Sequence, residues 1–455
     1  MLIVMGAAKF GRYINYVPYP VTTGFTAGIA VVIATLSLND FFGLGLGQLK
    51  GEYIDKVATL ATHLASFNPY ELTVGMVTLL LILFFGRITR AIPATVVGIS
   101  AGMLLAWLLS RYGIDIATIG SRFTYETAAG LKHGIPPYPP IFHFERIPSY
   151  AEFKTLLTPA MVIAALAALE SLLSATVADS MAGTKHDPNA ELNALGIANI
   201  LSGFASGIPA TGAIARTAAN IHSGAKTPIA SVIHALLIML YVLLLAPLIS
   251  YIPMASLASL LLVTAWRMSH VRQFIRTLKI APASDSVVLL TCFGLTVFVD
   301  MVAGVSVGIV LASLLFMKRI SELTEFNIFA VNANGETANN IALPDHAMIY
   351  RINGPLFFGT VEKAFDRYRF VHDHVTTLII DMENVPLIDM TGLVAMKSML
   401  SGIVHEGREV ILCGKWEITN RIMHKIADSA IVRHVETAVS VKDAVDKMAN
   451  NAAVD

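Results

Sequence analysis

The chain has 455 residues, of which 55% are apolar and 14% are charged, and its mean hydropathy is +0.66. Soluble proteins of this length carry more charge, so the composition excludes a wholly water-soluble protein and indicates one that lies largely in a bilayer. Residues 1–319 hold 20 basic and 14 acidic side chains, whereas residues 320–455 hold 12 and 18. We therefore expect one domain in lipid and one in water. Neither has the charge excess of a nucleic-acid-binding protein.

The beginning of the chain has some features of a signal peptide. The stretch MLIVMGAAKFGRY lacks a basic segment before its apolar residues, and it lacks a small-residue cleavage site. We expect it to be the remnant of a membrane helix.

Apolar runs that approach or reach the length needed to cross about 30 Å of hydrocarbon recur along the first domain. They cover residues 20–39, 71–86, 91–110, 156–183, 227–250, 254–268, 285–300 and 301–319. Three of them carry glycines spaced four residues apart, a pattern that lets helices approach closely in lipid. These pairs are Gly24 and Gly28, Gly98 and Gly102, and Gly304 and Gly308.

Basic residues gather in alternate loops, which fixes the expected orientation because such loops face the cytoplasm. The cytoplasmic set is Arg87, Arg90, Lys185, Arg216, Lys226, Arg267, Arg272, Arg276, Lys279, Lys318 and Arg319. The acidic second domain follows Arg319 and is expected in the cytoplasm as well. The long loops 40–70 and 111–155 are expected outside.

One acidic residue, Glu170, lies near the middle of the run 156–183, with Ser174 one turn later on the same helix face. Burying a carboxylate in a bilayer costs about 2.5 to 3.5 kcal/mol on insertion scales, so Glu170 needs a partner, a cavity or a proton. We consider two interpretations: a residue that couples transport to proton movement, and a protonated side chain that only packs helices together.

The stretch 191–221 is apolar but broken by glycines and one proline. It predicts a helix, an interruption and a short half-helix that starts near Pro209. Irregular backbone at membrane depth is tolerated only where it lines a cavity or is buried in protein.

The start of this half-helix predicts an anion site, because its free N–H groups and the positive end of its dipole attract negative charge. We expect the amides of Thr211, Gly212 and Ala213 to face the anion. Arg216 follows one turn later and can hold the anion or pair with Glu170. The alternative for Arg216 is an anchor at the cytoplasmic end of the helix.

Residues 345–450 alternate short apolar strands (AMIYRI, TTLIID, EVILCG) with helical patterns (TVEKAFDRYRFVH, TGLVAMKSMLSGIVHE, EITNRIMHKIAD). This order is typical of an α/β sandwich. Asp389 or Thr391 is placed to cap the helix that runs to Leu400. The two cysteines, Cys292 and Cys413, suggest no disulfide framework. No nucleotide loop, metal cluster or nucleophile motif occurs, so we expect neither an enzyme nor a cofactor.

The motifs VPYPVTTGFTAGIAV, AALESLLSATVADSMAGTKH, GIPATGAIARTAANI and SVGIVLASLLFMKRI, followed by the α/β tail, resemble the SulP (sulfate permease) family of anion transporters with a C-terminal STAS domain. The residues of these motifs are most similar to those of the bacterial branch of DauA-type C4-dicarboxylate transporters. The resemblance covers nearly the whole chain. It implies inverted repeats of seven spans, a core and a gate domain, and a substrate site between the half-helices of spans three and ten that moves as an elevator.

By position, Glu170 resembles the acidic residue of span eight that is linked with coupling, and Thr211, Gly212 and Ala213 resemble the span-ten anion cradle. Arg216 resembles the arginine of that span in proton-coupled and eukaryotic members. Thr391 matches the hydroxyl residue that is phosphorylated in related STAS proteins, with Asp389 in the same loop, so the resemblance implies a regulatory site. The capping role alone also explains both residues.

Two departures from the family pattern matter. Ile214 stands where sodium-coupled members have a hydroxyl residue, which favours protons. VPYPVTTGF resembles the opening of span five, so we expect spans one to three and most of span four to be missing. The proline-rich stretch of span three does not occur, because PPYPP at 136–140 lies in an expected external loop. Either the start of the coding sequence has been placed too far downstream, or the gene is a fragment.

Together these features predict a transmembrane transporter domain over 1–319, a linker over 320–344 and a cytoplasmic STAS domain over 345–455. We expect a secondary active, proton-coupled transporter of a small anion (C4-dicarboxylate, sulfate or bicarbonate) in the bacterial inner membrane. Its expected partners are the anion, the proton, membrane lipid, a second copy in a homodimer and a cytosolic protein at the STAS domain. The alternative is a truncated chain that transports nothing and acts as a membrane-tethered STAS module.

Overall fold

A computed structural model describes the chain except residues 48, 90–91, 128–129, 140–141, 143–148, 330–342, 345, 362–374, 428–429 and 452–455. The chain divides into two compact units, Met1–Ala312 and Ser313–Asp455. Helix α14 (Met301–Leu323) runs across the division.

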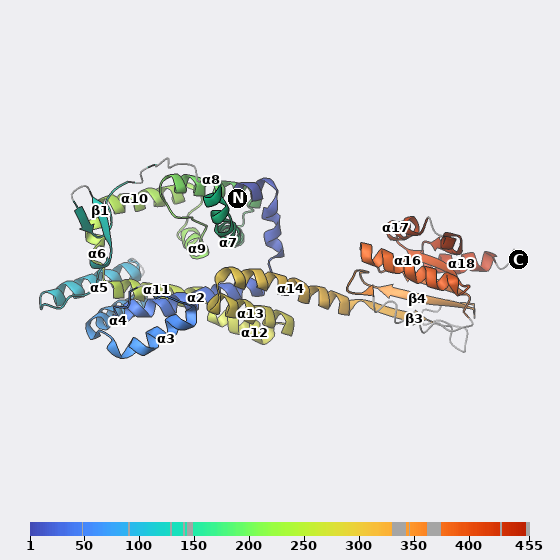
Figure 1. Cartoon of the computed structure of the whole chain (residues 1–455), viewed down its shortest axis with the longest axis horizontal. Coiled ribbons are helices and arrows are strands. Elements are labelled where there is room, and N and C mark those ends of the chain that lie inside the picture. Colours follow the sequence, from blue (N-terminus) through green and yellow to red (C-terminus); the bar gives the residue numbers. More distant parts are fainter. Residues whose placement is uncertain are drawn as a thin grey trace. The chain divides into compact units, whose positions relative to one another are not determined.

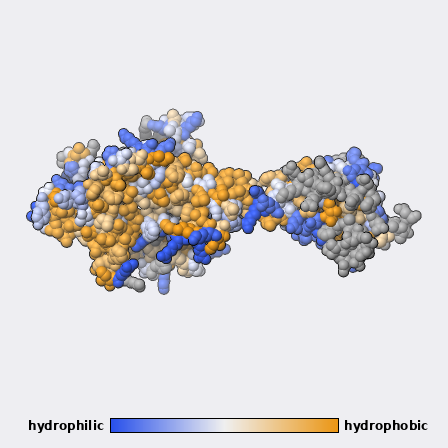
Figure 2. All heavy atoms as spheres, turned by 90° about the horizontal axis from the view of Figure 1, so that it is seen from below, coloured by the Kyte–Doolittle hydropathy of each residue, from blue (hydrophilic) through white to orange (hydrophobic). Residues whose placement is uncertain are grey.

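The first unit is helical, and each of the predicted apolar runs forms a helix. These helices are α2 (Tyr19–Phe41), α4 (Pro69–Phe84), α5 (Ala94–Ser110), α7 (Tyr150–Ala182), α10 (Ile229–Ile249), α11 (Met254–Met268), α13 (Ala283–Phe298) and α14. Within the described residues, five helical stretches have the length and composition to cross a membrane: Tyr19–Phe41, Pro69–Arg87, Tyr150–Ala182, Ile229–Ile249 and Met301–Leu323. Hydrophobic side chains cover much of the surface of this unit in Figure 2, as expected for a protein dissolved in lipid.

Shorter elements connect the apolar helices. They are α1 (Leu2–Ala7), the 3₁₀ helix η1 (Phe10–Tyr16), α3 (Tyr53–His63), α6 (Ile119–Arg122), α8 (Pro188–Phe204), α9 (Ile214–His222) and α12 (Val271–Ile280). The antiparallel hairpin of β1 (Thr124–Thr127) and β2 (Gly130–His133) lies in the loop that the sequence places outside.

Two groups of helices pack within this unit (Figure 1). In the first, which we call the α2 group, α2 contacts α11, α12 and α13, and α4 contacts α5 and α11. In the second, the α7 group, α7 contacts α8 and α9, and α1 and η1 cover α8. The α7 group contains the broken segment and Glu170.

The glycine pairs lie where helices of the α2 group touch one another or touch α14, which confirms that they serve close packing. A Cβ atom at Gly24 would lie 2.6 Å from the carbonyl oxygen of Leu289 on α13. One at Gly98 would lie 2.8 Å from the side chain of Ile82 on α4, and one at Gly308 would lie 3.3 Å from Cys292. In lipid, where apolar side chains gain little from leaving the solvent, such backbone approach supplies much of the helix association.

The second unit contains a five-stranded mixed sheet in the order β3-β4-β5-β6-β7. Its strands are β3 (Glu325–Phe329), β4 (Ala347–Asn353), β5 (Thr377–Met382), β6 (Glu409–Gly414) and β7 (Val435–Ala438). Strand β3 pairs antiparallel with β4, and the other pairs are parallel. Every residue of β5 is buried, as expected for a central strand covered on both faces.

Helices cover both faces of this sheet. Apolar side chains of α16 (Met390–His405) and α17 (Trp416–Ile426) pack on one face, against alternate residues of β4 and β5 such as Tyr350 and Ile380. Helix α18 (Val441–Asn451) packs on the other face, against Ile349, Ile379 and Ile411. The predicted α/β sandwich is therefore confirmed.

Two details of the second unit differ from the sequence prediction. The segment 320–344, expected as a linker, contains the end of α14 and strand β3, which extends the sheet. Strands β3 and β7 were not predicted from the sequence, because with five and four residues they are too short to show a clear alternating pattern. The helix expected from TVEKAFDRYRFVH falls almost wholly in 362–374, outside the described residues.

We predict that Gly24→Ala destabilises the membrane unit, because the new methyl group meets backbone atoms of α13 that cannot move aside. Overpacking of this kind costs about 1 to 3 kcal/mol, so the Tm of the purified protein in detergent should fall. Gly294→Ala is the matched control, since a Cβ atom there meets nothing within 4 Å. An equal loss of Tm in both variants would contradict the packing role of Gly24.

Candidate functional site

The segment between α8 and α9 is a break of nine residues, 205–213, in which the backbone is not helical. Its first turn contains Ser206 at a positive φ of 56°. The half-helix expected near Pro209 begins only at Ile214, with Ala213 as its N-cap at φ −98° and ψ 121°. The prediction of a break followed by a half-helix is correct, but the predicted start is wrong by five residues, because Ala210 is held in a different contact.

That contact is a two-point clamp from the Asn199 side chain on α8. Its Nδ2 donates to the carbonyl oxygen of Ala210 at 2.9 Å, and its Oδ1 accepts from the Ala210 amide at 2.8 Å. Ser202 Oγ also donates to the carbonyl of Ile208 at 3.1 Å. Side chains of α8 thus replace the helical hydrogen bonds that the break removes, and a carbonyl or amide left unpaired at this depth would be costly.

Helix α7 holds the other side of the break. Thr211 Oγ1 donates to the carbonyl oxygen of Ala167 at 2.9 Å. Gly212 lies against Ser171, since a Cβ atom at Gly212 would come within 3.1 Å of Ser171 Oγ. Ser174 Oγ donates to Thr217 Oγ1 on α9 at 3.0 Å. One face of α7 therefore fixes both the break and the half-helix.

Glu170 belongs to the same part of α7, because it lies three residues after Ala167 and four before Ser174. Its side chain is half-buried. The neighbouring Ser171 donates from Oγ to Glu191 Oε1 on α8 at 2.9 Å, which ties α7 to α8 beside Glu170. The structure thus holds Thr211 and Gly212 against α7, with Glu170 on the same part of that helix as Ser174.

Arg216 lies in the first turn of α9 and is exposed. Both Arg216 and Glu170 are described, and no ion pair joins them, so the direct pairing considered from the sequence is absent. By helix geometry, the amides that lack an intrahelical partner belong to the N-cap Ala213 and to Ile214, Ala215 and Arg216. The amides of Thr211 and Gly212 precede the helix, whereas Ala213 is its N-cap.

This arrangement can bind an anion. The dipole of α9, its free amides and the Arg216 guanidinium all favour negative charge at the start of the half-helix. Among the residues that the structure describes, no cluster of histidine, cysteine and carboxylate side chains could hold a metal ion.

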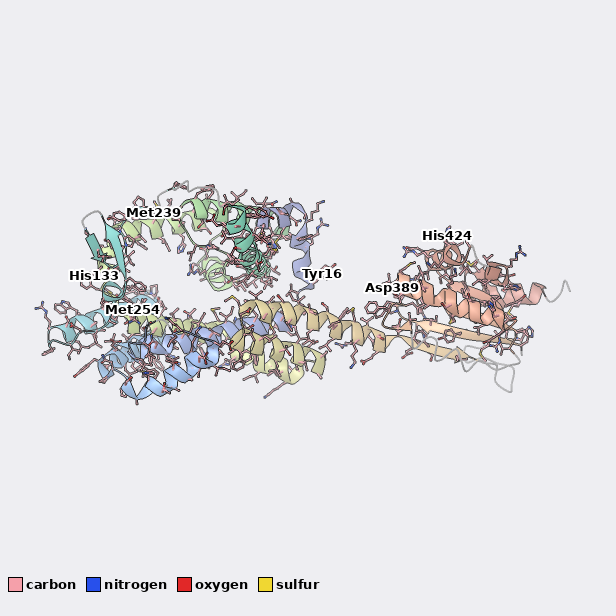
Figure 3. All side chains as sticks on the ribbon, viewed as in Figure 1. Tyr16, His133, Met239, Met254, Asp389 and His424 are labelled. Atoms are coloured by element: carbon pink, nitrogen blue, oxygen red, sulfur yellow. The ribbon has the colours of Figure 1, made fainter. Side chains whose placement is uncertain are left out.

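The second predicted site is at the start of α16, where Asp389 appears in Figure 3. Asp389 is the N-cap: Oδ1 accepts from the Gly392 amide at 2.6 Å and Oδ2 from the Phe358 amide at 3.2 Å. Thr391 is exposed in the first helical turn. Of the two residues that the sequence offered as caps, Asp389 therefore takes the role.

A unit of apolar helices with a break held between two of them, joined to an α/β domain, is the architecture of a multi-pass membrane protein. The comparisons are specific: the sulfate permease family profile matches residues 1–292 and the STAS domain profile matches 339–444. The chain belongs to the sulfate permease family and carries a STAS domain.

Named relatives span most of the chain. The Bacillus subtilis protein YvdB, provisionally named a sulfate transporter, is 34% identical over 93% of this chain and 77% of its own length. The bicarbonate transporter BicA of Synechocystis is 27% identical over 93% of this chain and 73% of its own length. Both relatives carry the name of a transporter.

Solved structures share the fold. Murine Slc26a9 in an inward-facing state aligns with a TM-score of 0.82 over 99% of this chain and 73% of that chain, at 20% identity. The transmembrane domain of cyanobacterial BicA aligns with a TM-score of 0.54 over 68% of this chain and 72% of that chain, at 25% identity. The predicted transporter fold with a STAS domain is therefore confirmed.

Sequence reasoning missed the residues that hold the site in place: Asn199, Ser171, Glu191 and Thr217. Asn199 and Glu191 were visible as polar residues within an apolar helix, a pattern that indicates a buried polar partner. Their partners, a backbone carbonyl and a serine hydroxyl, could not be identified without the fold.

We predict that Asn199→Ala weakens anion binding without removing any group that touches the anion. The variant loses two hydrogen bonds of about 1 kcal/mol each, so the break becomes mobile and the Kd should rise about tenfold. Isothermal titration of the purified protein measures this. Asn199→Asp is the matched control, because it keeps Oδ1 as the acceptor for the Ala210 amide and should lie between the two. Unchanged affinity in Asn199→Ala would contradict the positioning role.

Proposed function

We propose that the protein is a secondary active transporter that carries a small anion across the bacterial inner membrane. The observation that carries this proposal is the break 205–213, which Asn199 and α7 fix beside Glu170 and which leads into the free amides of α9 and Arg216. A cationic helix start next to an acidic residue offers the two charges that anion–proton symport needs. The anion binds at Ile214–Arg216, with Thr211, Gly212 and Ala213 lining the approach and Ser174 supporting α9.

The substrate is sulfate, bicarbonate or a C4-dicarboxylate such as succinate. The names of YvdB and BicA support the first two, and the DauA-like motifs support the third. Helix amides and a guanidinium bind carboxylate and sulfate by the same physics, so the choice rests on cavity size and competing anions. Uptake of each labelled anion into proteoliposomes, with the others as unlabelled competitors, identifies it.

We assign proton coupling to Glu170. Its side chain is half-buried, and it lies on the part of α7 that contacts the break. Within the described part of the chain it forms neither a hydrogen bond nor an ion pair. A carboxylate in this position binds a proton when the anion charge must be neutralised and releases it when the site opens to the cytoplasm. Ile214 in place of a hydroxyl residue supports protons over sodium.

The variant Glu170→Gln should abolish the rise of uptake at lower external pH, because an amide cannot take up and release the coupled proton. The initial rate of labelled anion uptake into proteoliposomes, measured across an imposed pH gradient, tests this. Glu170→Asp keeps a titratable group and should retain a pH response. If Glu170→Gln keeps the native pH profile, the coupling role is wrong.

Removing the guanidinium with Arg216→Ala should raise the Kd for the anion by about tenfold to a hundredfold, since hydrogen bonds to charged groups contribute about 1.5 to 3 kcal/mol. Because Arg216 is exposed, its loss should leave the Tm unchanged. Arg216→Lys keeps the charge and should recover part of the affinity. Native affinity in Arg216→Ala would leave only the anchoring role.

Regulation belongs to the cytoplasmic domain in this proposal. Thr391 is exposed at the start of α16, so a phosphate there would meet the favourable end of the helix dipole. The added charge would alter the surface around Asp389. We propose that this surface binds a cytosolic protein partner. We further propose that the transporter assembles as a homodimer.

A further inference from the structure

A cavity of about 790 Å³ lies apart from the anion site, between α12 and the first residues of α2 and α13. Its polar lining consists of residues of α12, of Tyr19 on α2 and of Asp285 on α13; those of α12 are Arg272, Gln273, Arg276 and Thr277. All three elements belong to the α2 group, whereas the break belongs to the α7 group. Nothing in the transport proposal uses these residues.

Helix α12 presents two distinct faces. Its inner face packs on the α2 group, with the ring of Phe274 at 5.4 Å from that of Phe293, and with Thr277 half-buried. Its outer face is exposed and carries Arg272 and Arg276 one turn apart, which places both guanidinium groups on the same side. The helix is therefore held firmly while its cations remain available.

The two arginines have no counter-ion among the residues that the structure describes. Within the described residues no ion pair involves Arg272 or Arg276, although Asp285 also lines the cavity. The Asp285 carboxylate instead accepts a hydrogen bond from Ser284 Oγ at 3.2 Å. Gln273 donates from Nε2 to the Tyr19 hydroxyl, which joins α12 to α2 at the cavity wall. The lining is thus net positive, with neutral hydrogen-bonding groups beside the charges.

The cavity also lies where a lipid headgroup would be. It borders the first turns of two apolar helices, α2 and α13, on the side that the positive-inside rule assigns to the cytoplasm. Apolar side chains accompany the cations on the exposed surface of α12: Ile275 is 45% exposed and Ile280, which lines the cavity, is 71% exposed. A surface with cations and exposed isoleucines together matches a ligand that has both a charged head and an apolar tail.

We propose that this cavity binds the phosphate group of an anionic phospholipid. Arg272 and Arg276 hold the phosphate oxygens, since planar guanidinium groups match phosphate in a bidentate geometry. Gln273 and Tyr19 contact the rest of the headgroup, and the acyl chains lie against Ile280 and the neighbouring apolar helices. The bound lipid bridges α12 to the starts of α2 and α13 and so stabilises the α2 group.

Native mass spectrometry of the full chain tests this, after reconstitution in phosphatidylcholine vesicles that do or do not contain phosphatidylglycerol. The native protein should retain phosphatidylglycerol in preference to phosphatidylcholine. The double variant Arg272→Gln/Arg276→Gln should bind it more weakly by roughly fivefold for each arginine removed. Both side chains are exposed, so the variant should fold, and its anion uptake should persist.

Arg267→Gln/Lys279→Gln is the matched control. It removes the same charge from the same region, but neither residue lines the cavity. Native retention by this control and loss in the cavity variant support the proposal, whereas equal loss in both would reduce the effect to general surface charge and overturn it.

Two further experiments distinguish a phospholipid from free phosphate and from an acidic protein segment as the ligand of the cavity. Glycerol 3-phosphate or inorganic phosphate that displaces the lipid when added at the same concentration would show a site for free phosphate and overturn the lipid assignment. A photo-crosslinking residue in place of Ile280, which lines the cavity, should capture lipid. Capture of acidic peptides from the cytoplasmic domain instead would also overturn it.

Discussion

The need to satisfy backbone polar groups within an apolar unit is the constraint on which the rest of the site depends. Between α8 and α9 the chain leaves the helical hydrogen-bond pattern for nine residues, and the backbone groups of this break need other partners. Asn199 meets this need by bonding both the amide and the carbonyl of Ala210. Once Ala210 is held in this way, α9 begins at Ile214, and its free amides and Arg216 form the anion site that we propose.

The arrangement of the helices follows from packing without a hydrophobic driving force. Gly24 and Gly98 bring helix backbones into direct contact in the α2 group, while Thr211 and Ser174 join α7 to the break and to α9 through hydrogen bonds. The extensive contacts lie within each group. Two internally tight groups, of which one contains the candidate site, allow that site to move with its geometry preserved in the transport function that we propose.

The sequence predicted the elements whose signal is local. Long apolar runs, glycine spacing and the strand–helix alternation of the tail each depend on residues close together in the chain, and the structure confirms them. The start of α9 was predicted at Pro209 because proline and glycine there look like a helix start. The actual start depends on Asn199, which contacts Ala210 eleven residues away. The ion pair of Glu170 with Arg216 is absent for a similar reason, because opposite charges in the sequence do not show how far apart the two side chains lie in the fold. Asp389, by contrast, was identified as a cap from its local pattern.

Substrate protection at the start of α9 tests the central claim most directly. Ala213→Cys places a thiol at the N-cap, and the native cysteines give little background because both are buried and burial raises the pKa of the Cys413 thiol to about 12. The transported anion should slow the reaction of the introduced N-cap thiol with a labelling reagent. A cysteine in place of Ile208, which is 83% exposed in the same break, should react equally with and without the anion. Labelling of the N-cap thiol that none of sulfate, bicarbonate and succinate slows would contradict an anion site at α9.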